Sequence, residues 1–134
     1  MKIFIDSNIL ISAARNPAGK PYFAFLKAVS FPNTGLVCEQ NIEEVRRAFN
    51  RKFPLQILLL ERFLAKALPL LQVAPVPVDA LDDEGKIRDA NDRPILRAAI
   101  KAGADILLTG DRDFLESAVI IPKIMTAAQF TDGL

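Results

Sequence analysis

Short, uninterrupted apolar runs separated by stretches of helical periodicity constrain the fold of this chain most strongly. The clearest runs lie at residues 3–5, 36–38 and 106–108, and each is bounded by polar residues or glycine. Such runs are typical of strands buried on both faces, as in parallel sheets. Parallel neighbours need crossover connections, and the helices of those crossovers cover both faces of the sheet. The pattern therefore predicts an α/β fold: a three-layer α/β/α sandwich with a central, mostly parallel sheet, in a single domain over residues 1–134.

The elements expected around these runs alternate along the chain. The spacing of apolar residues predicts helices at 9–14, 21–30, 39–51, 54–71, 89–102 and 126–130, the fifth of them ending at Gly103. Residues 72–78, which alternate with prolines, are expected to form an edge strand or an extended link, and 118–121 a last strand. Residues 110–113 are expected to form a turn. The polar stretch 79–88 is expected to be a solvated loop that contains Asp82, Asp83 and Glu84.

The residue types that are missing narrow the possible chemistry. The chain contains no histidine, which excludes Ser-His-Asp triads, Cys-His dyads and histidine zinc sites. Its one cysteine, Cys38, allows no internal disulfide and is expected to be a small buried residue. No uncharged apolar run reaches eighteen residues and Asp6 interrupts the first run, so we expect neither a membrane span nor a signal peptide. These features favour a cytoplasmic protein whose chemistry depends on carboxylates, hydroxyls, lysines or bound metal.

Carboxylates stand where a parallel sheet would bring them together. Asp6 directly follows the first strand, and Asp111 follows the strand at 106–108 after two intervening residues. Functional crevices of open α/β sheets lie beyond the carboxyl ends of the strands, so both acids are expected at one edge. Glu44 and Asp92 belong to helices that enter from that edge. Four such carboxylates repel one another unless a divalent cation binds them, and oxygen-only ligands favour Mg²⁺ or Mn²⁺.

Four segments resemble the motifs of the PIN domain family. Residues 3–13, IFIDSNILISA, are similar to the strand, aspartate, serine and asparagine with which such domains open. Residues 42–47, IEEVRR, resemble the family's helix with an acidic residue, and residues 89–99, DANDRPILRAA, its third motif. Residues 103–114, GADILLTGDRDF, resemble its fourth motif. Order and spacing agree over nearly the whole chain, and the similarity is greatest to stand-alone, VapC-like members of toxin–antitoxin pairs.

The resemblance implies a function and a set of site residues. The function is that of a Mg²⁺- or Mn²⁺-dependent endoribonuclease, the toxin of a type II toxin–antitoxin pair, with RNA as substrate, a cognate antitoxin as partner and a homodimeric state. The metal-binding catalytic acids would be Asp6, Glu44, Asp92 and Asp111, with Ser7, Asn8 and Thr109 in support and Asp113 assisting through a second metal or a water.

In two pairs of nearby acids, only one member is expected to be a metal ligand. Glu43 and Glu44 are adjacent, and one turn of helix cannot point both side chains at one site, so Glu44 is preferred as the ligand. Asp89 precedes Asp92 by three residues at a helix start, which favours a structural cap for Asp89.

Basic and apolar side chains on the predicted helices allow more than one interpretation. Basic residues on two helices are possible contacts to RNA phosphates, and a solvated face or an antitoxin contact is the alternative. The arginines concerned are Arg46, Arg47, Arg93 and Arg97. An apolar stripe on the helix expected at 54–71 is interpreted as core or as a dimer interface. Its members are Leu58, Leu59, Phe63, Leu70 and Leu71.

Two further functions compete with ribonuclease activity. A catalytically silent PIN-fold module would bind RNA or regulate without cutting it, and the complete set of acids argues against that alternative. Phosphotransfer at an aspartate is disfavoured, because haloacid-dehalogenase-like phosphatases need a second acid two residues after the first. This chain has Asn8 at that position.

Overall fold

The centre of the molecule is a five-stranded sheet in which every neighbouring pair of strands is parallel. The computed structural model describes residues 1–133. The strands are β1 (Lys2–Ile5), β2 (Thr34–Val37), β3 (Leu71–Val73), β4 (Ile106–Leu108) and β5 (Lys123–Met125). Their spatial order is β3-β2-β1-β4-β5, so the chain builds outward from β1 on one side and then on the other. The carboxyl end of β1 is therefore the point where a crevice is expected.

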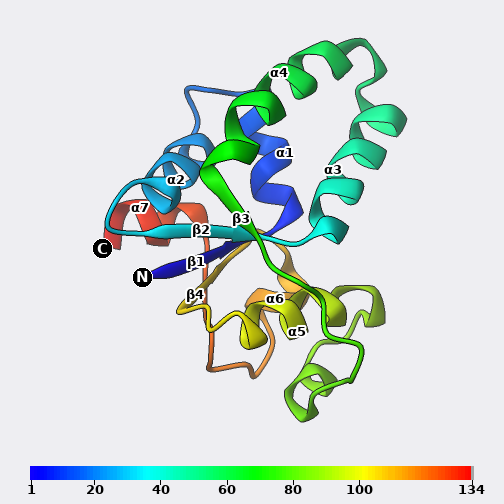
Figure 1. Cartoon of the computed structure of the whole chain (residues 1–134), viewed down its shortest axis with the longest axis vertical. Coiled ribbons are helices and arrows are strands. Elements are labelled where there is room, and N and C mark those ends of the chain that lie inside the picture. The colour runs from blue at the N-terminus through cyan, green and yellow to red at the C-terminus, as the bar shows by residue number, and fades with distance from the viewer. Residues whose placement is uncertain (134) are drawn as a thin grey trace.

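Helices cover both faces of this sheet, as Figure 1 shows. One face shares an apolar core with α1 (Ser7–Arg15), α2 (Lys20–Val29), α3 (Glu39–Lys52), α4 (Ile57–Ala67) and α7 (Ala127–Gly133). The other face packs against α5 (Arg93–Lys101) and α6 (Arg112–Leu115). The expected three-layer α/β/α sandwich is thus confirmed. No helix within residues 1–133 is long and apolar enough to span a membrane.

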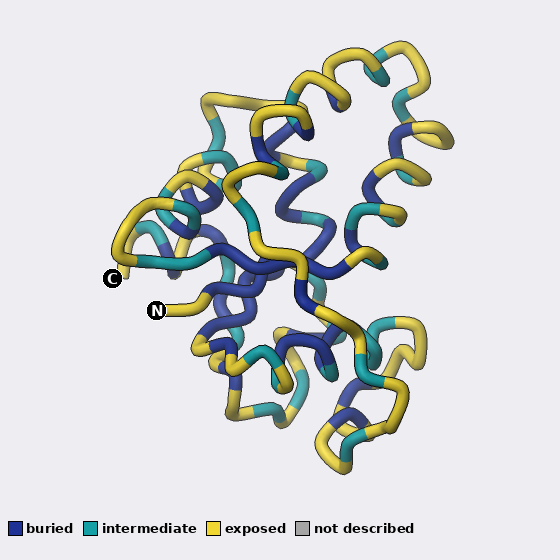
Figure 2. Tube along the Cα trace, in the orientation of Figure 1, coloured by how far each residue is buried: buried dark blue, intermediate teal, exposed yellow. Residues whose placement is uncertain are grey.

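Burial on both faces explains why the strands are uninterrupted apolar runs. In β1, Ile3 and Ile5 belong to the core beneath α1 and α2, whereas Phe4 belongs to the core beneath α5. Successive side chains of a strand point to opposite faces, so each residue needs an apolar partner layer. In β4, Leu107 likewise faces α5 while its neighbours face the larger core. Figure 2 shows the resulting band of buried residues through the sheet.

The helix predicted over 54–71 is divided in the structure. A 3₁₀ turn η1 (Pro54–Gln56) precedes α4, and a second turn η2 (Leu68–Leu70) follows it and leads into β3. Pro69 has no N–H to donate to the carbonyl four residues before it, so the α-helical hydrogen-bond pattern ends at Ala67. The apolar stripe on this segment divides as well. Phe63 and Leu71 pack against the core, whereas the exposed members are Leu58, Leu59 and Leu70.

The last strand was predicted at the wrong residues. The sequence favoured 118–121, but the strand that pairs with β4 is Lys123–Met125, with Leu107 opposite Ile124. Ile120 and Ile121 are exposed instead, at 79% and 73%. Their apolar, β-branched character matched a strand, but strand pairing depends on contacts with β4 that local composition does not report.

The connection from β3 to α5 also differs from the prediction. It contains the 3₁₀ turns η3 (Asp82–Lys86) and η4 (Ala90–Asp92), and Glu84 within η3 is buried rather than solvated. The reason is an ion pair with Arg97 of α5. The end of α5 is as predicted: Gly103 has a φ of 72° and follows the C-cap residue Ala102. The N–H groups of Gly103 and Ala104 close the helix on the carbonyls of Ile100 and Ala99 at 3.0 Å each.

Candidate metal centre

Asp6 stands at the carboxyl end of the central strand, where it also caps α1. Its backbone N–H donates to the carbonyl of Leu108 at 3.0 Å, which ties the ends of β1 and β4 together. Its Oδ1 accepts the N–H of Ser7 at 2.8 Å. Its Oδ2 accepts the Thr109 hydroxyl at 2.8 Å and the Asn8 amide at 3.0 Å. Asp6 is only 4% exposed, and these donors replace water around its carboxylate and hold it in one orientation.

Asn41, which the sequence analysis did not single out, links this carboxylate to α3. It is fully buried, and its Nδ2 donates to Ser7 Oγ at 3.1 Å and to Asp6 Oδ1 at 3.5 Å. Its Oδ1 accepts the backbone N–H of Cys38 at 3.0 Å, which closes the first turn of α3. Ser7 Oγ then donates to Glu44 Oε1 at 3.3 Å. A polar residue three positions after a strand-to-helix junction is the signal that would have identified it.

The end of β4 brings the second strand-borne acid to the same place. Asp111 caps α6 by accepting the N–H of Asp113 on Oδ1 at 2.9 Å. Its own N–H donates to Thr109 Oγ1 at 3.0 Å, and the N–H of Gly110 donates to Asn8 Oδ1 at 2.8 Å. Thr109 therefore joins Asp6 and Asp111 through one hydroxyl. Asn8 fixes the backbone between them.

A cavity of about 290 Å³ lies beyond these strand ends and is lined by acidic side chains. Glu44 rather than Glu43 lines this cavity. Ser7 and Asn8 also line it, while Thr109 is buried behind it. Asp113 is not part of its lining and lies to one side. The predicted acids that line the cavity are Asp6, Glu44, Asp92 and Asp111.

The acids raise one another's pKa values. Burial is the largest cause for Asp6, whose pKa lies above its usual value despite the hydrogen bonds that oppose the shift. Burial and the charge of Asp6 raise the pKa of Glu44. Burial, with the charges of Asp111 and Asp6, raises the pKa of Asp92 to about 8. Carboxylates in this arrangement are stabilised in their ionised form only when a positive charge joins them.

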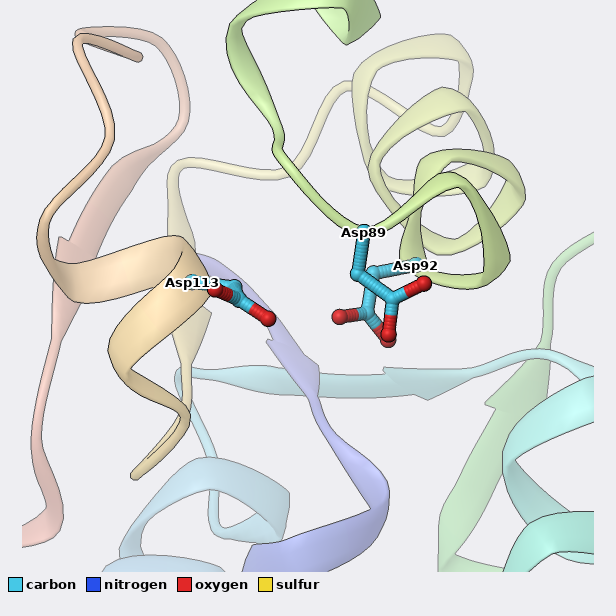
Figure 3. Close-up of side chains that lie close together, drawn as sticks. All are labelled: Asp89, Asp92 and Asp113. Carbon is cyan, nitrogen blue, oxygen red and sulfur yellow. The ribbon is translucent and has the colours of Figure 1, made fainter.

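Asp92 also belongs to a neighbouring group of acids, shown in Figure 3. One carboxylate oxygen from each of Asp89, Asp92 and Asp113 lies within 4.8 Å of the others. Asp89 accepts the N–H of Asn91 at 2.9 Å, so it caps η4 as predicted while its side chain faces this group. Asp113 is already paired with the guanidinium of Arg88, Nη2 to Oδ1 at 3.0 Å. Asp92 is therefore the acid that the cavity and this group share.

Basic side chains of α3 line the cavity beside Glu44, which belongs to the same helix. Arg47, Arg51 and Lys52 line the acid cavity, and Arg47 and Arg51 also line an adjoining cavity of about 770 Å³ between α3 and η4. Within residues 1–133 none of these three forms an ion pair with a carboxylate. An anion can therefore approach the acids along a cationic surface.

The other predicted arginines have partners within the fold. Arg46 forms a forked pair with Glu61 of α4, Nε to Oε1 at 3.1 Å and Nη2 to Oε2 at 3.3 Å. Arg93 donates its Nε to the carbonyl of Ile87 at 3.0 Å. Arg97 is bound to Glu84. Neighbours in sequence, Arg46 and Arg47, thus have different surroundings.

The sequence profile of one family, the PIN domain, matches residues 2–113. The chain belongs to the PIN domain family. This PIN domain also has the fold of one chain in the crystal structure of VapBC2 from Rickettsia felis bound to a DNA fragment from their promoter. The TM-score is 0.67 at 18% identity, over 94% of this chain and 98% of that one. No curated protein sequence matches the PIN domain described here.

The residues of the acid cavity fit a hard divalent cation. Carboxylates are the donors that Mg²⁺ and Mn²⁺ prefer, and neither thiolate nor imidazole lines the cavity to favour zinc. Burial and mutual repulsion raise the pKa values of Asp6, Glu44 and Asp92, and in the case of Glu44 they outweigh the opposing charge of Arg47. A cation would be held by carboxylates of this cavity together with the neighbouring group of Asp89, Asp92 and Asp113, whose oxygens lie within 4.8 Å of one another and which shares Asp92 with the cavity.

Proposed function

We propose that this PIN domain is a divalent-metal-dependent endoribonuclease that hydrolyses RNA phosphodiester bonds. One observation supports the proposal above all. Four carboxylates from four elements that are far apart in the sequence line one cavity beyond the carboxyl end of β1. The family match supports it too, because PIN domains are typically nucleases.

Each of the chain's own groups has a distinct part in this proposal. A bound Mg²⁺ or Mn²⁺ would activate water and stabilise the leaving oxygen of the phosphodiester. Asp6, held by the hydroxyl of Thr109 and the amide of Asn8, supplies a carboxylate that is already oriented. Ser7 orients Glu44 from the other side. Because these ligands are fixed before the metal binds, little reorganisation is needed when substrate arrives.

The cationic wall of α3 supplies contacts for the substrate. Arg47, Arg51 and Lys52 face the cavity from one side of the helix, and phosphate oxygens of RNA are the anions that they would bind. Arg46 and Arg97 do not line the cavity, and they pair with Glu61 and Glu84 instead.

Cleavage of RNA with and without metal tests the proposed reaction. Wild-type protein is expected to cut a panel of RNAs in Mg²⁺ or Mn²⁺ and to stop in chelator. Asp6→Asn and Asp111→Asn should each reduce cleavage by at least about a hundredfold, because each removes a ligand charge. Asp132→Asn is the matched control, since Asp132 is an exposed acid paired with Lys20.

The same experiment separates the two candidate functions. A protein that binds RNA and Mn²⁺ but leaves every RNA intact would be the catalytically silent module. Metal-independent cleavage, or full activity of Asp6→Asn, would contradict the proposed reaction itself.

Neighbouring arginines allow a controlled test of substrate binding. Arg47→Gln should weaken RNA binding and reduce the slope of log affinity against log salt by about 0.7, the value for one lost contact to a single strand. Arg46→Gln should leave both unchanged, because Arg46 does not line the cavity and pairs with Glu61 instead. Titrations at several salt concentrations, in an Asp111→Asn background that prevents cleavage, measure both quantities. Equal losses in the two variants would contradict the assignment.

We further propose that the protein is the toxin of a type II toxin–antitoxin pair, acts in the cytoplasm and forms a homodimer. The fold shared with a chain of a VapBC2 complex supports an antitoxin partner. Exposed leucines on and before α4, among them Leu55 at 99% and Leu58 at 64%, support an apolar interface. Analytical ultracentrifugation of wild type and Leu58→Glu tests the dimer, which the charged variant should dissociate. Monomeric wild type at micromolar concentration would contradict it.

A further inference from the structure

Residues 75–92, which connect β3 to α5, have few apolar contacts of their own. Figure 2 shows most of this connection exposed, and within it only Glu84 and Ile87 are buried. A segment with so little buried surface is normally free to shift relative to its surroundings. This one nevertheless ends on Asp89 and Asp92, whose carboxylates face the acid cavity and the adjoining group of acids.

Arg97 of α5 attaches this connection through every nitrogen of its guanidinium. Its Nη2 donates to Glu84 Oε1 at 2.7 Å and its Nε to Oε2 at 2.9 Å, a forked pair. Its Nη1 donates to the carbonyls of Pro77 and Val78 at 2.8 and 3.3 Å. Glu84 Oε2 also accepts the N–H of Leu81 at 2.8 Å. One side chain thus holds two turns of the connection against the helix.

A charged pair in this place provides orientation more than stability. Burying an ion pair has a desolvation cost that largely offsets its attraction, so apolar residues of similar size would stabilise the fold as well or better. A forked arginine–carboxylate contact, however, permits a single relative orientation of its two partners. The Glu84 and Arg97 side chains are only 7% and 15% exposed, so water does not loosen the contact.

Further contacts follow Glu84 along the connection as far as the acids. Three residues later, Ile87 is buried in the core beneath α5, and its carbonyl accepts Arg93 Nε at 3.0 Å. Arg88 then reaches across to Asp113. Asp89 caps η4, whose last residue is Asp92. Displacing Glu84 would therefore move Asp89 and Arg88 relative to Asp113, and release the turn that presents Asp92.

We infer that the Glu84–Arg97 pair is a positioning device for the acid site: it fixes residues 77–92 on α5 so that Asp89 and Asp92 are presented to Asp113 and Asp111 in one arrangement. The inference rests on the proposed function, because the arrangement matters through the metal that these acids would bind. Neither Glu84 nor Arg97 lines the acid cavity, so both act through other residues.

Mn²⁺ affinity and local hydrogen exchange test the pair in the full-length protein. Glu84→Gln removes the charge, and Arg97→Lys keeps the charge but loses the fork. Each variant, shown by circular dichroism to be folded, should bind Mn²⁺ about tenfold more weakly in calorimetry, the usual effect of losing a group that orients metal ligands. Amides in 77–92 should exchange faster while those of β1 and β4 do not change. Asp83→Asn is the matched control, because Asp83 in the same turn pairs only with exposed Lys86.

The outcomes distinguish this inference from the proposed function. Wild-type Mn²⁺ affinity in folded Glu84→Gln or Arg97→Lys would overturn the positioning role and leave the metal site intact. Unchanged exchange in 77–92 would overturn it by showing that the pair does not hold the connection. Wild-type protein that binds no Mn²⁺ would overturn the proposed function and this use of the pair together.

Discussion

The acids that line the cavity differ in the groups that surround each carboxylate. Asp6 is surrounded by donors, namely the N–H of Ser7, the Thr109 hydroxyl and the Asn8 amide, so its position is fixed by the protein alone. The ionisation of Asp92 is opposed by burial and then by other carboxylates, Asp111 first among them. Asp92 is therefore the acid whose ionisation depends most on a cation, and Asp6 is the one that sets the location of the site.

Asn41 provides a prediction at the scale of one side chain. Asn41→Ala removes the donor to Ser7 and the acceptor of the Cys38 N–H, which should lower the free energy of unfolding by about 2 kcal/mol because buried polar groups lose their partners. Asn41→Asp keeps the acceptor but directs a carboxylate at Asp6, 3.5 Å away in wild type. It should lose more stability at pH 8 than at pH 5, since the two acids repel when both are ionised.

Urea unfolding of both variants at the two pH values measures this effect. Asn50→Ala is the control, because Asn50 is an exposed residue of the same helix. Identical losses for Asn41→Asp at pH 5 and pH 8 would show that the asparagine does not depend on the charge of Asp6.

At the scale of elements, the packing of β2 between α2 and β3 leaves no room for a side chain at position 35. A Cβ on Gly35 would come within 2.8 Å of Val29 Cγ1 on α2 and 2.9 Å of Leu71 Cδ2 on β3. Valine is restricted at χ1 and cannot easily turn away. Gly35→Ala should therefore lower the free energy of unfolding by about 2 kcal/mol through overpacking. Gly85→Ala in η3 is the control, since nothing lies within 4 Å of its Cβ position, and it should be neutral or slightly stabilising. Thermal unfolding compares them, and equal midpoints would contradict the close packing of β2.

Elements were predictable from sequence where one property controlled them. The strands β1, β2 and β4 are buried on both faces, so their apolar runs identified them within a residue or two. The helix expected at 54–71 was too long because Pro69 limits α-helix geometry although its neighbours remain apolar. The last strand was placed four to five residues early, because Ile120 and Ile121 match a strand in composition but not in pairing.

At the scale of the whole molecule, the acid cavity couples stability to pH. The pKa of Asp92 is about 8 in the folded protein against 3.8 for the free side chain, so the folded state binds an extra proton between these values. The unfolded state binds fewer protons in this window, and stability in chelator should therefore fall as pH rises from about 4 to about 8. Glu84 acts in a separate window, since its pKa is lowered to about 2 and its contribution is lost only below about pH 4.5.

Divalent cations should reverse this loss. Millimolar Mn²⁺ is expected to raise the unfolding midpoint at pH 8 more than at pH 5, because it binds the ionised acids of the folded state. Asp92→Asn should flatten the pH dependence in chelator and remove most of the Mn²⁺ effect. Differential scanning calorimetry across pH 5–8 measures both. Stability that increases with pH in chelator over this range would contradict the raised pKa.

The sequence by itself determined the parallel α/β fold and the order in which acids follow strands and begin helices, because burial on two faces and helix periodicity are local properties of the chain. Only the tertiary structure decided which groups meet: Asn41 beneath Asp6, Glu84 inside a predicted loop, and Arg47 rather than Arg46 beside the acids. Each of these depends on a partner from another element, and residue spacing within one segment carries no information about that partner's position. Local pattern therefore specified the sheet and its edge, and contacts between distant segments specified the surroundings of each acid.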